Sequence, residues 1–381
     1  MSKLQELIKE LCPERVEFRK LGEVCEITIG EFVHKNKQIE DGKYPVYNGG
    51  RENTGFYESY NNIGNKVIIS ARGANAGYVN KVLTNYWAGN SCYSLFPLDV
   101  QYLNWFFLYY VLKSKEKELM GNQQTGSIPA LSKKQIEQIE IPLPPLEVQN
   151  EIVRILDTFT SHAAELQAEL QARKEQYEYY RNKLLTFDKD TKWERLGELV
   201  SFMNGKGHEK YIEDNGKYIV VNSKFISTNG EVKKYSDLQI SPLFKDMILM
   251  VMSDLPNGKA LAKCFIVDED NKYTLNQRIG AFTIKNTNII TTYFLFYILN
   301  RNKQLLTYDN GVDQTNLRKD NILNISIPIP SLSEQQRIVS ILDKFESLVN
   351  DLSEGLPAEI AAVQEQYEYY RNKLLTFKRK S

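Results

Sequence analysis

Arginine, asparagine, glutamine and lysine side chains lie on glycine-rich turns in two parts of this 381-residue chain. Such side chains can read the edges of nucleic-acid bases, because arginine forms paired hydrogen bonds with guanine, and asparagine or glutamine does so with adenine. We predict base or phosphate contacts for Asn48, Arg51, Asn53, Arg72, Asn75 and Asn90 in the first part, and for Asn222, Lys224, Asn257, Lys259, Gln277 and Arg278 in the second. The alternative for each asparagine beside a glycine is a turn residue with positive φ.

Arg72 is the strongest single candidate, because it follows the β-like run KVIIS and opens the glycine-containing segment ARGANAGYV. If Arg72 reads a guanine, Arg72→Ala should cost about 1–3 kcal/mol on the cognate DNA. An equal loss on unrelated DNA would instead indicate a phosphate contact. The formal net charge of zero does not by itself indicate nucleic-acid binding, so the prediction depends on these loops.

The sequence lacks the common catalytic and metal-binding patterns. His34, His162 and His208 are not at metal-ligand spacing, and the four cysteines lie far apart without a C-x-x-C pair. There is no G-x-x-x-x-G-K-[ST] phosphate loop, no H-E-x-x-H motif and no G-x-S-x-G elbow. We therefore expect a binding protein with no catalytic residue, no bound metal and no cofactor.

The composition is that of an ordinary folded protein, with 42% hydrophobic and 25% charged residues. At roughly 100–200 residues per domain, the length suggests two domains or three. No run of about 18 apolar residues is present, which argues against a membrane span. Together with the scattered cysteines and the charged first residues, this favours a cytoplasmic protein.

An internal repeat is the strongest pattern in the chain. The segment EQYEYYRNKLLTF occupies 175–187 and again 365–377, which is 190 positions later. Shorter matches upstream recur at an offset of 186, and they pair 141–144 with 327–330 and 152–157 with 338–343. The remaining sequences are barely alike, so two similar arms alternate with two divergent heads.

Each arm is predicted to be a long helix. Residues at alternating steps of four and three over 152–184 are apolar except for Arg173, which is the pattern of a coiled-coil seam. The seam recurs over 338–374 with one extra step of four near Gly355 and Pro357, where we expect a break or kink. The two seams would pack on each other; the alternative is that each arm docks separately on a partner.

The first arm also contains a four-residue duplication, in which AELQ at 164–167 is repeated at 168–171. Four extra residues lengthen a helix by about 6 Å and rotate its remaining turns by about 40°. The alternative is that these residues are simply good helix formers.

Each head is predicted to be a mixed α/β domain with a twisted, mostly antiparallel sheet. Short β-like runs alternate with turn clusters, and an aromatic helix is expected at about 101–120 in the first head and 291–300 in the second. The fold class is therefore α+β. We expect four segments in the order head, arm, head, arm, with boundaries at 1–145, 146–187, 188–330 and 331–381.

Four segments of the chain identify a family. The opening LQELIKELCPERVEFRKLGEV, the later RLGELV and PLPPLEVQNEIVRILDTF, and the repeated EQYEYYRNKLLTF resemble the specificity subunit of type I restriction–modification enzymes. The resemblance covers essentially the whole chain, including the order of heads and arms.

The resemblance implies two target recognition domains that each read one half of a split, asymmetric DNA sequence. It implies that the arms pack as an antiparallel coiled coil, so that a pseudo-twofold relates the heads. It also implies double-stranded DNA, two methyltransferase subunits and, through the complex, restriction subunits as partners, while methylation and cleavage belong to those subunits. Several family members carry a short helical repeat at the place of AELQ, so one copy should change the unread gap by one or two base pairs.

Two other interpretations remain open. The chain could serve a type IIB-like system, in which the catalytic partner is a fused nuclease and methyltransferase. It could also be a coiled-coil scaffold that binds only protein. The latter predicts no sequence-specific DNA footprint, even with a partner present.

Overall fold

The computed structural model describes residues 3–121, 129–256, 258–350 and 355–380. Contacts divide the chain into two compact units, in which Met1–Ala168 and Ala358–Ser381 form the first and Glu169–Pro357 forms the second. The long helix α6 (Leu146–Leu184) contributes to both units, and α13 (Leu356–Leu374) belongs almost entirely to the first. Each head therefore forms one compact unit with parts of both arms.

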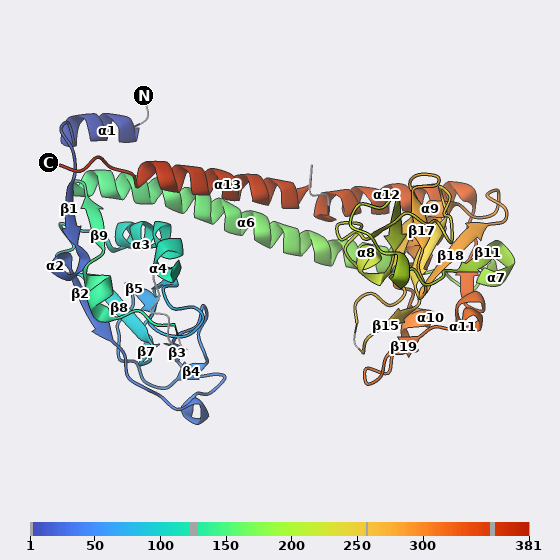
Figure 1. Ribbon diagram of the computed structural model, residues 1–381, viewed down its shortest axis with the longest axis horizontal. Helices are drawn as coiled ribbons and strands as arrows, with labels where there is room; N and C mark the ends of the chain where they lie inside the picture. Colours follow the sequence, from blue (N-terminus) through green and yellow to red (C-terminus); the bar gives the residue numbers. More distant parts are fainter. Residues whose placement is uncertain (1–2, 122–128, 257, 351–354, 381) are drawn as a thin grey trace. The chain divides into compact units, whose positions relative to one another are not determined.

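The first unit is built around an antiparallel sheet in the order β2-β8-β5-β6, whose strands are coloured blue to cyan in Figure 1. A smaller sheet has the order β4-β3-β7, with β3 and β7 parallel, and β1 pairs with β9. The strands are β1 Glu17–Lys20, β2 Cys25–Ile29, β3 Tyr44–Tyr47, β4 Phe56–Tyr57, β5 Lys66–Ser70, β6 Val79–Val82, β7 Trp87–Ala88, β8 Cys92–Pro97 and β9 Glu140–Leu143. The shorter helices are α1 Lys3–Leu11, α2 Leu21–Val24, η1 Lys35–Lys37, α3 Trp105–Ser114, α4 Glu116–Gly121 and α5 Lys133–Glu137.

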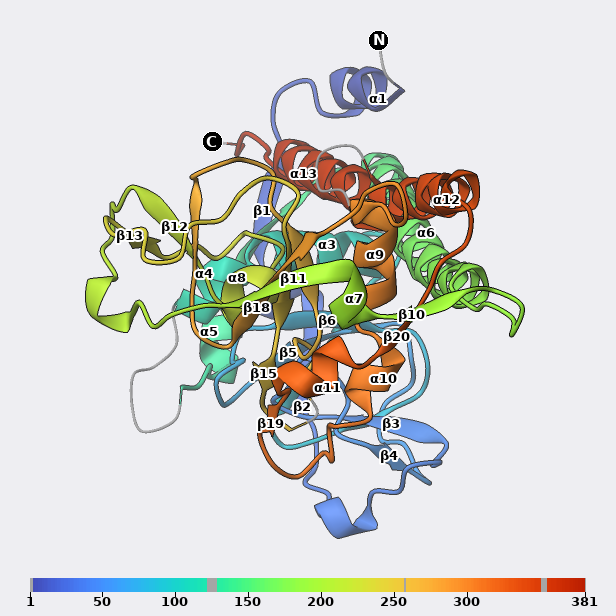
Figure 2. The same ribbon diagram turned by 90° about the vertical axis from the view of Figure 1, so that its right-hand side faces the viewer.

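The second unit repeats this plan. Its main sheet has the antiparallel order β11-β18-β14-β16, its smaller sheet has the order β13-β12-β17, and β12 and β17 are parallel. The strands are β10 Trp193–Arg195, β11 Val200–Asn204, β12 Tyr218–Val221, β13 Tyr235–Ser236, β14 Ile248–Val251, β15 Ser253–Asp254, β16 Cys264–Ile266, β17 Tyr273–Leu275, β18 Ile279–Ile284, β19 Thr315–Asn316 and β20 Ser326–Pro328. The helices are α7 Leu196–Leu199, η2 Glu209–Tyr211, α8 Ser223–Ser227, α9 Thr292–Leu299, α10 Lys303–Leu306, α11 Lys319–Leu323 and α12 Leu332–Asn350. Figure 2 shows α9 beside α12, against which it packs.

The aromatic helix of the first head is shorter than the sequence predicted. Helix α3 begins at Trp105 because the Asn104 side chain accepts hydrogen bonds from the backbone N–H groups of Phe106 and Phe107. This N-cap fixes the start four residues after the expected position. A separate helix, α4, follows Lys115, so the segment expected at 101–120 is two helices.

A buried glutamine joins each aromatic helix to the start of an arm helix. The Gln149 side chain is fully buried; its Oε1 accepts from Asn104 N–H, and its Nε2 donates to the carbonyls of Tyr102 and Pro144. The distances lie between 2.8 and 2.9 Å. Gln335 makes the corresponding three bonds in the second unit, to Thr291, Ile289 and Pro330. The two glutamines are 186 positions apart, the offset of the sequence repeat.

The arm helices run antiparallel within each unit. In the first, Arg379 follows α13 and forms an ion pair with Glu140, just before α6, while the Phe159 ring of α6 stacks on Tyr370 of α13 at 5.3 Å. In the second, the Ile329 N–H, just before α12, donates to the carbonyl of Lys192, which follows α6.

Farther along the same pair in the second unit, Tyr180 of α6 stacks on Phe345 of α12 at 5.6 Å. The predicted break also has a structural counterpart, because Gly355 lies in a bend immediately before α13. Pro357 is the second residue of that helix, where its missing N–H costs no hydrogen bond.

Candidate nucleic-acid interface

In the first unit, most of the predicted site residues come together where β5 ends and β8 begins. We call this the first corner and define it as residues 48–51, 70–75 and 89–92. The Ala71 N–H donates to the Ser91 carbonyl at 2.8 Å, and Asn48 Oδ1 accepts from the Ser91 N–H at 3.2 Å. A Cβ on Gly49 would lie 2.4 Å from the Arg72 carbonyl oxygen, so only glycine permits this close approach.

Arg51 is exposed, but its guanidinium already contacts other residues of the first corner. Its Nε donates to Asn75 Oδ1 at 3.2 Å, and its guanidinium lies 5.5 Å from the centre of the Tyr78 ring. Asn80 Nδ2 donates to the Arg51 carbonyl at 3.4 Å. Asn75 is thus engaged as an acceptor, and this contact links the segments 48–51 and 70–75 of the corner.

Two other predicted residues of the first corner are exposed and, among the described residues, have no side-chain hydrogen bond. Arg72 follows β5, and Asn90 lies in the turn before β8. Asn53 is also exposed, in the segment between β3 and β4, and no described contact joins it to the corner. The first corner therefore presents Arg72 and Asn90 to a ligand more directly than it presents Asn48, Arg51 or Asn75.

The predicted residues of the second unit are divided among three segments. Asn222 is the N-cap of α8, because its Oδ1 accepts from the Phe225 N–H at 2.9 Å, and Lys224 is exposed on the same helix. Gln277 Nε2 donates to Glu209 Oε1 at 3.0 Å. Arg278 is exposed before β18 and has a positive φ of 71°.

The remaining two predictions fall on the loop between β15 and β16. Lys259 is exposed there, whereas Asn257 lies outside the described residues. The Asp254 carboxylate organises this loop, because its oxygens accept from the N–H groups of Leu255, Ala260 and Leu261 at 2.9, 2.7 and 3.1 Å. Sequence reasoning missed Asp254, although an aspartate opening a Pro-Asn-Gly turn is a known signal for such a loop.

The positive-φ alternative does not hold for the described candidate asparagines. Among the non-glycine residues with positive φ that the structure describes, none is a predicted asparagine, whereas Arg278 is one of them. The asparagines instead fall into two groups: Asn48, Asn75 and Asn222 use their side chains in internal hydrogen bonds, and Asn53 and Asn90 are exposed.

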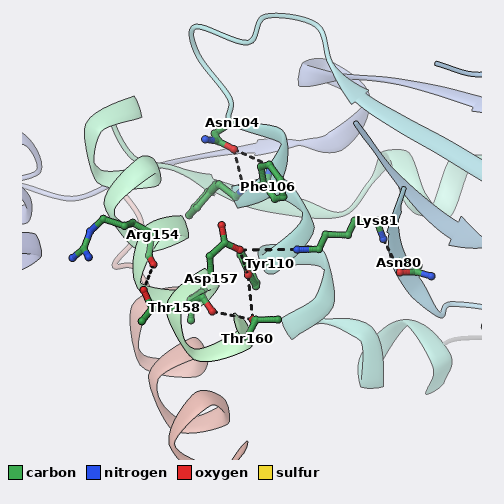
Figure 3. Close-up of polar contacts among 11 residues, drawn as sticks. Asn80, Lys81, Asn104, Phe106, Tyr110, Arg154, Asp157, Thr158 and Thr160 are labelled. Carbon is green, nitrogen blue, oxygen red and sulfur yellow. Dashed lines mark hydrogen bonds and ion pairs between the residues drawn. The ribbon is translucent and has the colours of Figure 1, made fainter. Parts of the chain in front are cut away.

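A polar cluster holds the first head on its arm segment (Figure 3). The Tyr110 hydroxyl on α3 donates to Asp157 Oδ1 on α6 at 2.5 Å and lies 3.4 Å from Thr160 Oγ1. Lys81 of β6 reaches the same carboxylate at 4.0 Å, with its Nζ 5.0 Å from the Phe106 ring centre. Burial lowers the pKa of Lys81, and the neighbouring carboxylate partly opposes that effect.

The second unit has a related cluster with an additional carboxylate. The Tyr297 hydroxyl lies 2.6 Å from Asp343 and 2.9 Å from Glu346, both on α12. Burial raises the pKa of the Glu346 carboxyl above its usual range. Both clusters couple a head to its arm segment, so a recognition surface on the head keeps a defined orientation relative to that segment.

No described group of three or more histidine, cysteine, aspartate and glutamate residues is arranged to hold a metal ion. Within the described part of the chain, no helix is both long and apolar enough to cross a membrane.

Comparison with known proteins identifies the family. The family model described as the type I restriction modification DNA specificity domain matches residues 13–176 and again residues 189–362. The chain belongs to this family. The double match also confirms the internal repeat, because each copy covers one head and adjoining arm residues.

Two curated members of the specificity family illustrate the similarity. The specificity subunit of an Escherichia coli type I restriction enzyme is 35% identical over 71% of this chain and 70% of its own length. A putative type I restriction enzyme specificity subunit from Haemophilus influenzae is 30% identical over 97% of this chain and 98% of its own length.

Solved structures from type I restriction–modification systems share the fold. The S subunit of a type I restriction–modification system from M. genitalium aligns with a TM-score of 0.60 and 20% identity, over 95% of this chain and 96% of that one. A chain from a structural study of type I system assembly and conformational transition aligns with a TM-score of 0.63 and 16% identity, over 95% and 98% of the two chains. These likenesses confirm an α+β fold with two repeated domains.

Proposed function

We propose that this chain is the DNA specificity subunit of a type I restriction–modification complex and reads a split, asymmetric DNA target. The observation that carries the proposal is the double match to the specificity domain, once over each head. Two heads with different surface residues suit two different half-sites. In this proposal the chain has no catalytic role, and methylation and cleavage belong to other subunits of the complex.

The proposal assigns DNA contact to the side chains that the heads leave available. Arg72 and Asn90 in the first unit, and Lys224, Lys259 and Arg278 in the second, are exposed. Their cationic and amide groups match phosphate oxygens and base edges. The engaged residues Asn48, Arg51, Asn75, Asn222 and Gln277 would act mainly by holding the loops in shape, and Asn53 and Asn257 remain predictions from sequence.

The proposal also assigns the arms to two methyltransferase subunits, with restriction subunits joining through the complex. The thirteen residues 175–187 recur unchanged at 365–377, although the heads differ. Tyr179 and Tyr369 are 61% and 59% exposed, so the same large aromatic side chain faces solvent at both places. Exposed aromatic side chains are frequent anchors in protein interfaces, and two equal surfaces suit two copies of one partner.

The four-segment division at 1–145, 146–187, 188–330 and 331–381 belongs to the same proposal, with two recognition domains and two arms. The AELQ duplication within 164–171 would act as a spacer, because one copy adds about 6 Å of helix against about 3.4 Å per base pair. Since the proposed target is chromosomal DNA, the complex would work in the cytoplasm.

Methylation mapping tests the proposal directly. The chain is co-expressed with the methyltransferase subunit encoded beside its gene, and methylated positions are mapped across the host genome. We expect a motif of two defined halves with a fixed gap, and deletion of residues 164–167 should shorten that gap by one or two base pairs. A methyltransferase preparation whose methylation pattern does not change when this chain is omitted would contradict the proposal and favour a protein-only scaffold.

A further inference from the structure

The backbone of the first corner defines positions that can be compared between the two heads. Strands β5 and β8 pair with Ser70 opposite Cys92. One step beyond, the Ala71 N–H donates to the Ser91 carbonyl at 2.8 Å, and the Leu131 N–H donates to the Ala71 carbonyl at 2.9 Å. These contacts fix where each residue of the corner lies along the two strands.

The second unit contains the same pattern of backbone contacts. Strands β14 and β18 pair with Val251 opposite Ile279. One step beyond, the Met252 N–H donates to the Arg278 carbonyl at 2.9 Å, and the Leu317 N–H donates to the Met252 carbonyl at 2.7 Å. We call this the second corner and define it as residues 251–254 and 276–279.

Superimposing these patterns pairs Arg72 with Ser253 and Ser91 with Arg278. At the first of these two positions, the first corner has an arginine and the second corner has a serine. At the other position the two residue types are exchanged. In the first corner the arginine comes from the end of β5, and in the second it comes from the turn before β18. At these two matched positions each corner thus holds one arginine, although the heads are barely alike in sequence.

Both corner arginines are available for a ligand. Among the residues that the structure describes, neither Arg72 nor Arg278 has a hydrogen-bond or ion-pair partner for its guanidinium, and both are exposed. Two other arginines of the heads are already engaged: Arg51 donates to Asn75, and Arg301 donates to the carbonyl of Leu261 at 3.0 Å. The corner arginines are therefore set apart from the arginines that stabilise loops.

The backbone that carries each corner arginine is tightly held. The Arg72 carbonyl packs against Gly49, where any side chain would clash. Arg278 adopts a left-handed conformation, which is unfavourable for a long side chain and persists only where surrounding contacts impose it. The hydrogen bond from Met252 to its carbonyl is one such contact. A rigid base is what bidentate recognition needs, because the planar guanidinium must meet two acceptors at once.

We propose that Arg72 and Arg278 are equivalent specificity-determining residues, each reading one guanine in the half-site of its own head. The guanine presents O6 and N7 in the major groove, and a guanidinium can donate to both. This inference rests on the proposed DNA-reading function and adds to it the base and the residue in each half.

Lysine substitutions separate base reading from phosphate binding. Arg72→Lys and Arg278→Lys keep the positive charge but lose the planar fork that meets two acceptors. The variants are assayed in the complete complex with the methyltransferase subunit, by genome-wide methylation mapping. Each should relax the motif at one guanine of one half-site, with a loss of discrimination of about 5- to 150-fold, equivalent to about 1–3 kcal/mol. The other half-site and the gap should be unchanged.

Matched controls use arginines outside the corners. Arg19→Lys and Arg195→Lys change exposed arginines at the head–arm joints and should leave the motif intact. The inference is overturned if the motif stays unchanged with Arg72→Lys or with Arg278→Lys. It is also overturned if both variants relax the same half-site, or if either variant abolishes methylation completely. If the unaltered complex methylates a split motif while these variants fail to relax it, only this inference falls; if the unaltered complex methylates no split motif, the proposed function falls with it.

Discussion

Replacement of the buried glutamine Gln149 by leucine should sharply destabilise the first unit. Leucine has a similar size but no polar group, so the Asn104 N–H and the carbonyls of Tyr102 and Pro144 would lose their partners. An unsatisfied buried polar group costs about 1–3 kcal/mol, and three together should cost about 3–6 kcal/mol, since carbonyls tolerate the loss better than N–H groups. That is a large part of the about 5–15 kcal/mol that stabilises a typical domain.

Urea unfolding and amide hydrogen exchange measure this loss and its location. Gln149→Leu should lower the free energy of unfolding and increase exchange at the start of α3, while Gln335→Leu should do the same at the start of α9. Gln167→Leu is the control, because Gln167 is exposed on the same helix α6 and its change should stay within about 0.5 kcal/mol. A loss below about 1 kcal/mol for Gln149→Leu, or equal exchange in both units, would refute the assignment of the glutamine as the joint.

Two further predictions concern carboxylates on the arm helices. The hydrogen bond from Arg154, followed by that from Lys3, lowers the pKa of Glu151 to about 2, against about 4.3 in an unfolded chain. Its stabilising contribution is complete above the unfolded pKa and is lost as pH falls through the folded pKa of about 2. In thermal unfolding, Glu151→Gln should therefore be less stable than the parent at pH 7, and the difference should shrink toward zero as pH falls to about 2 and below. A difference that does not change with pH would contradict this. Burial raises the pKa of Glu346, so the folded state binds its proton more tightly and stability falls as pH rises through the folded pKa. Glu346→Gln should therefore unfold at a higher temperature than the parent at pH 8, with a smaller difference at pH 5, and a lower unfolding temperature at pH 8 would show that the charge is stabilising.

The arms could be predicted from sequence because their periodicity is a direct record of burial. The seam positions Leu156 and Leu342 are fully buried, and the break expected beside Gly355 corresponds to a bend. The parallel pairing of β3 with β7, and of β12 with β17, was not predicted, since pairing between distant segments depends on tertiary contacts that short-range patterns do not contain.

The candidate recognition residues were harder to predict, because residue type does not reveal where a side chain points. Asn48 and Asn222 have the same chemistry as the exposed Asn90, but both accept internal hydrogen bonds from backbone N–H groups. The placement of Arg72 and Arg278 at matching corners was also hidden from the sequence, since one follows a strand and the other precedes one. Only the backbone pairing places them at matching corners.

The division of the first unit between two distant parts of the chain has a consequence for its synthesis. Ala168 is separated by the 189 residues of the second unit from Ala358, which begins the segment that completes the first unit. At about 5–20 residues per second, the interval is roughly 10 to 40 s. During that time the ring of Phe159 lacks its partner Tyr370, whereas the second unit is encoded without interruption. Until the C-terminal segment is made, the nascent first head therefore exposes apolar surface that Tyr367, Leu374 and Phe377 later cover.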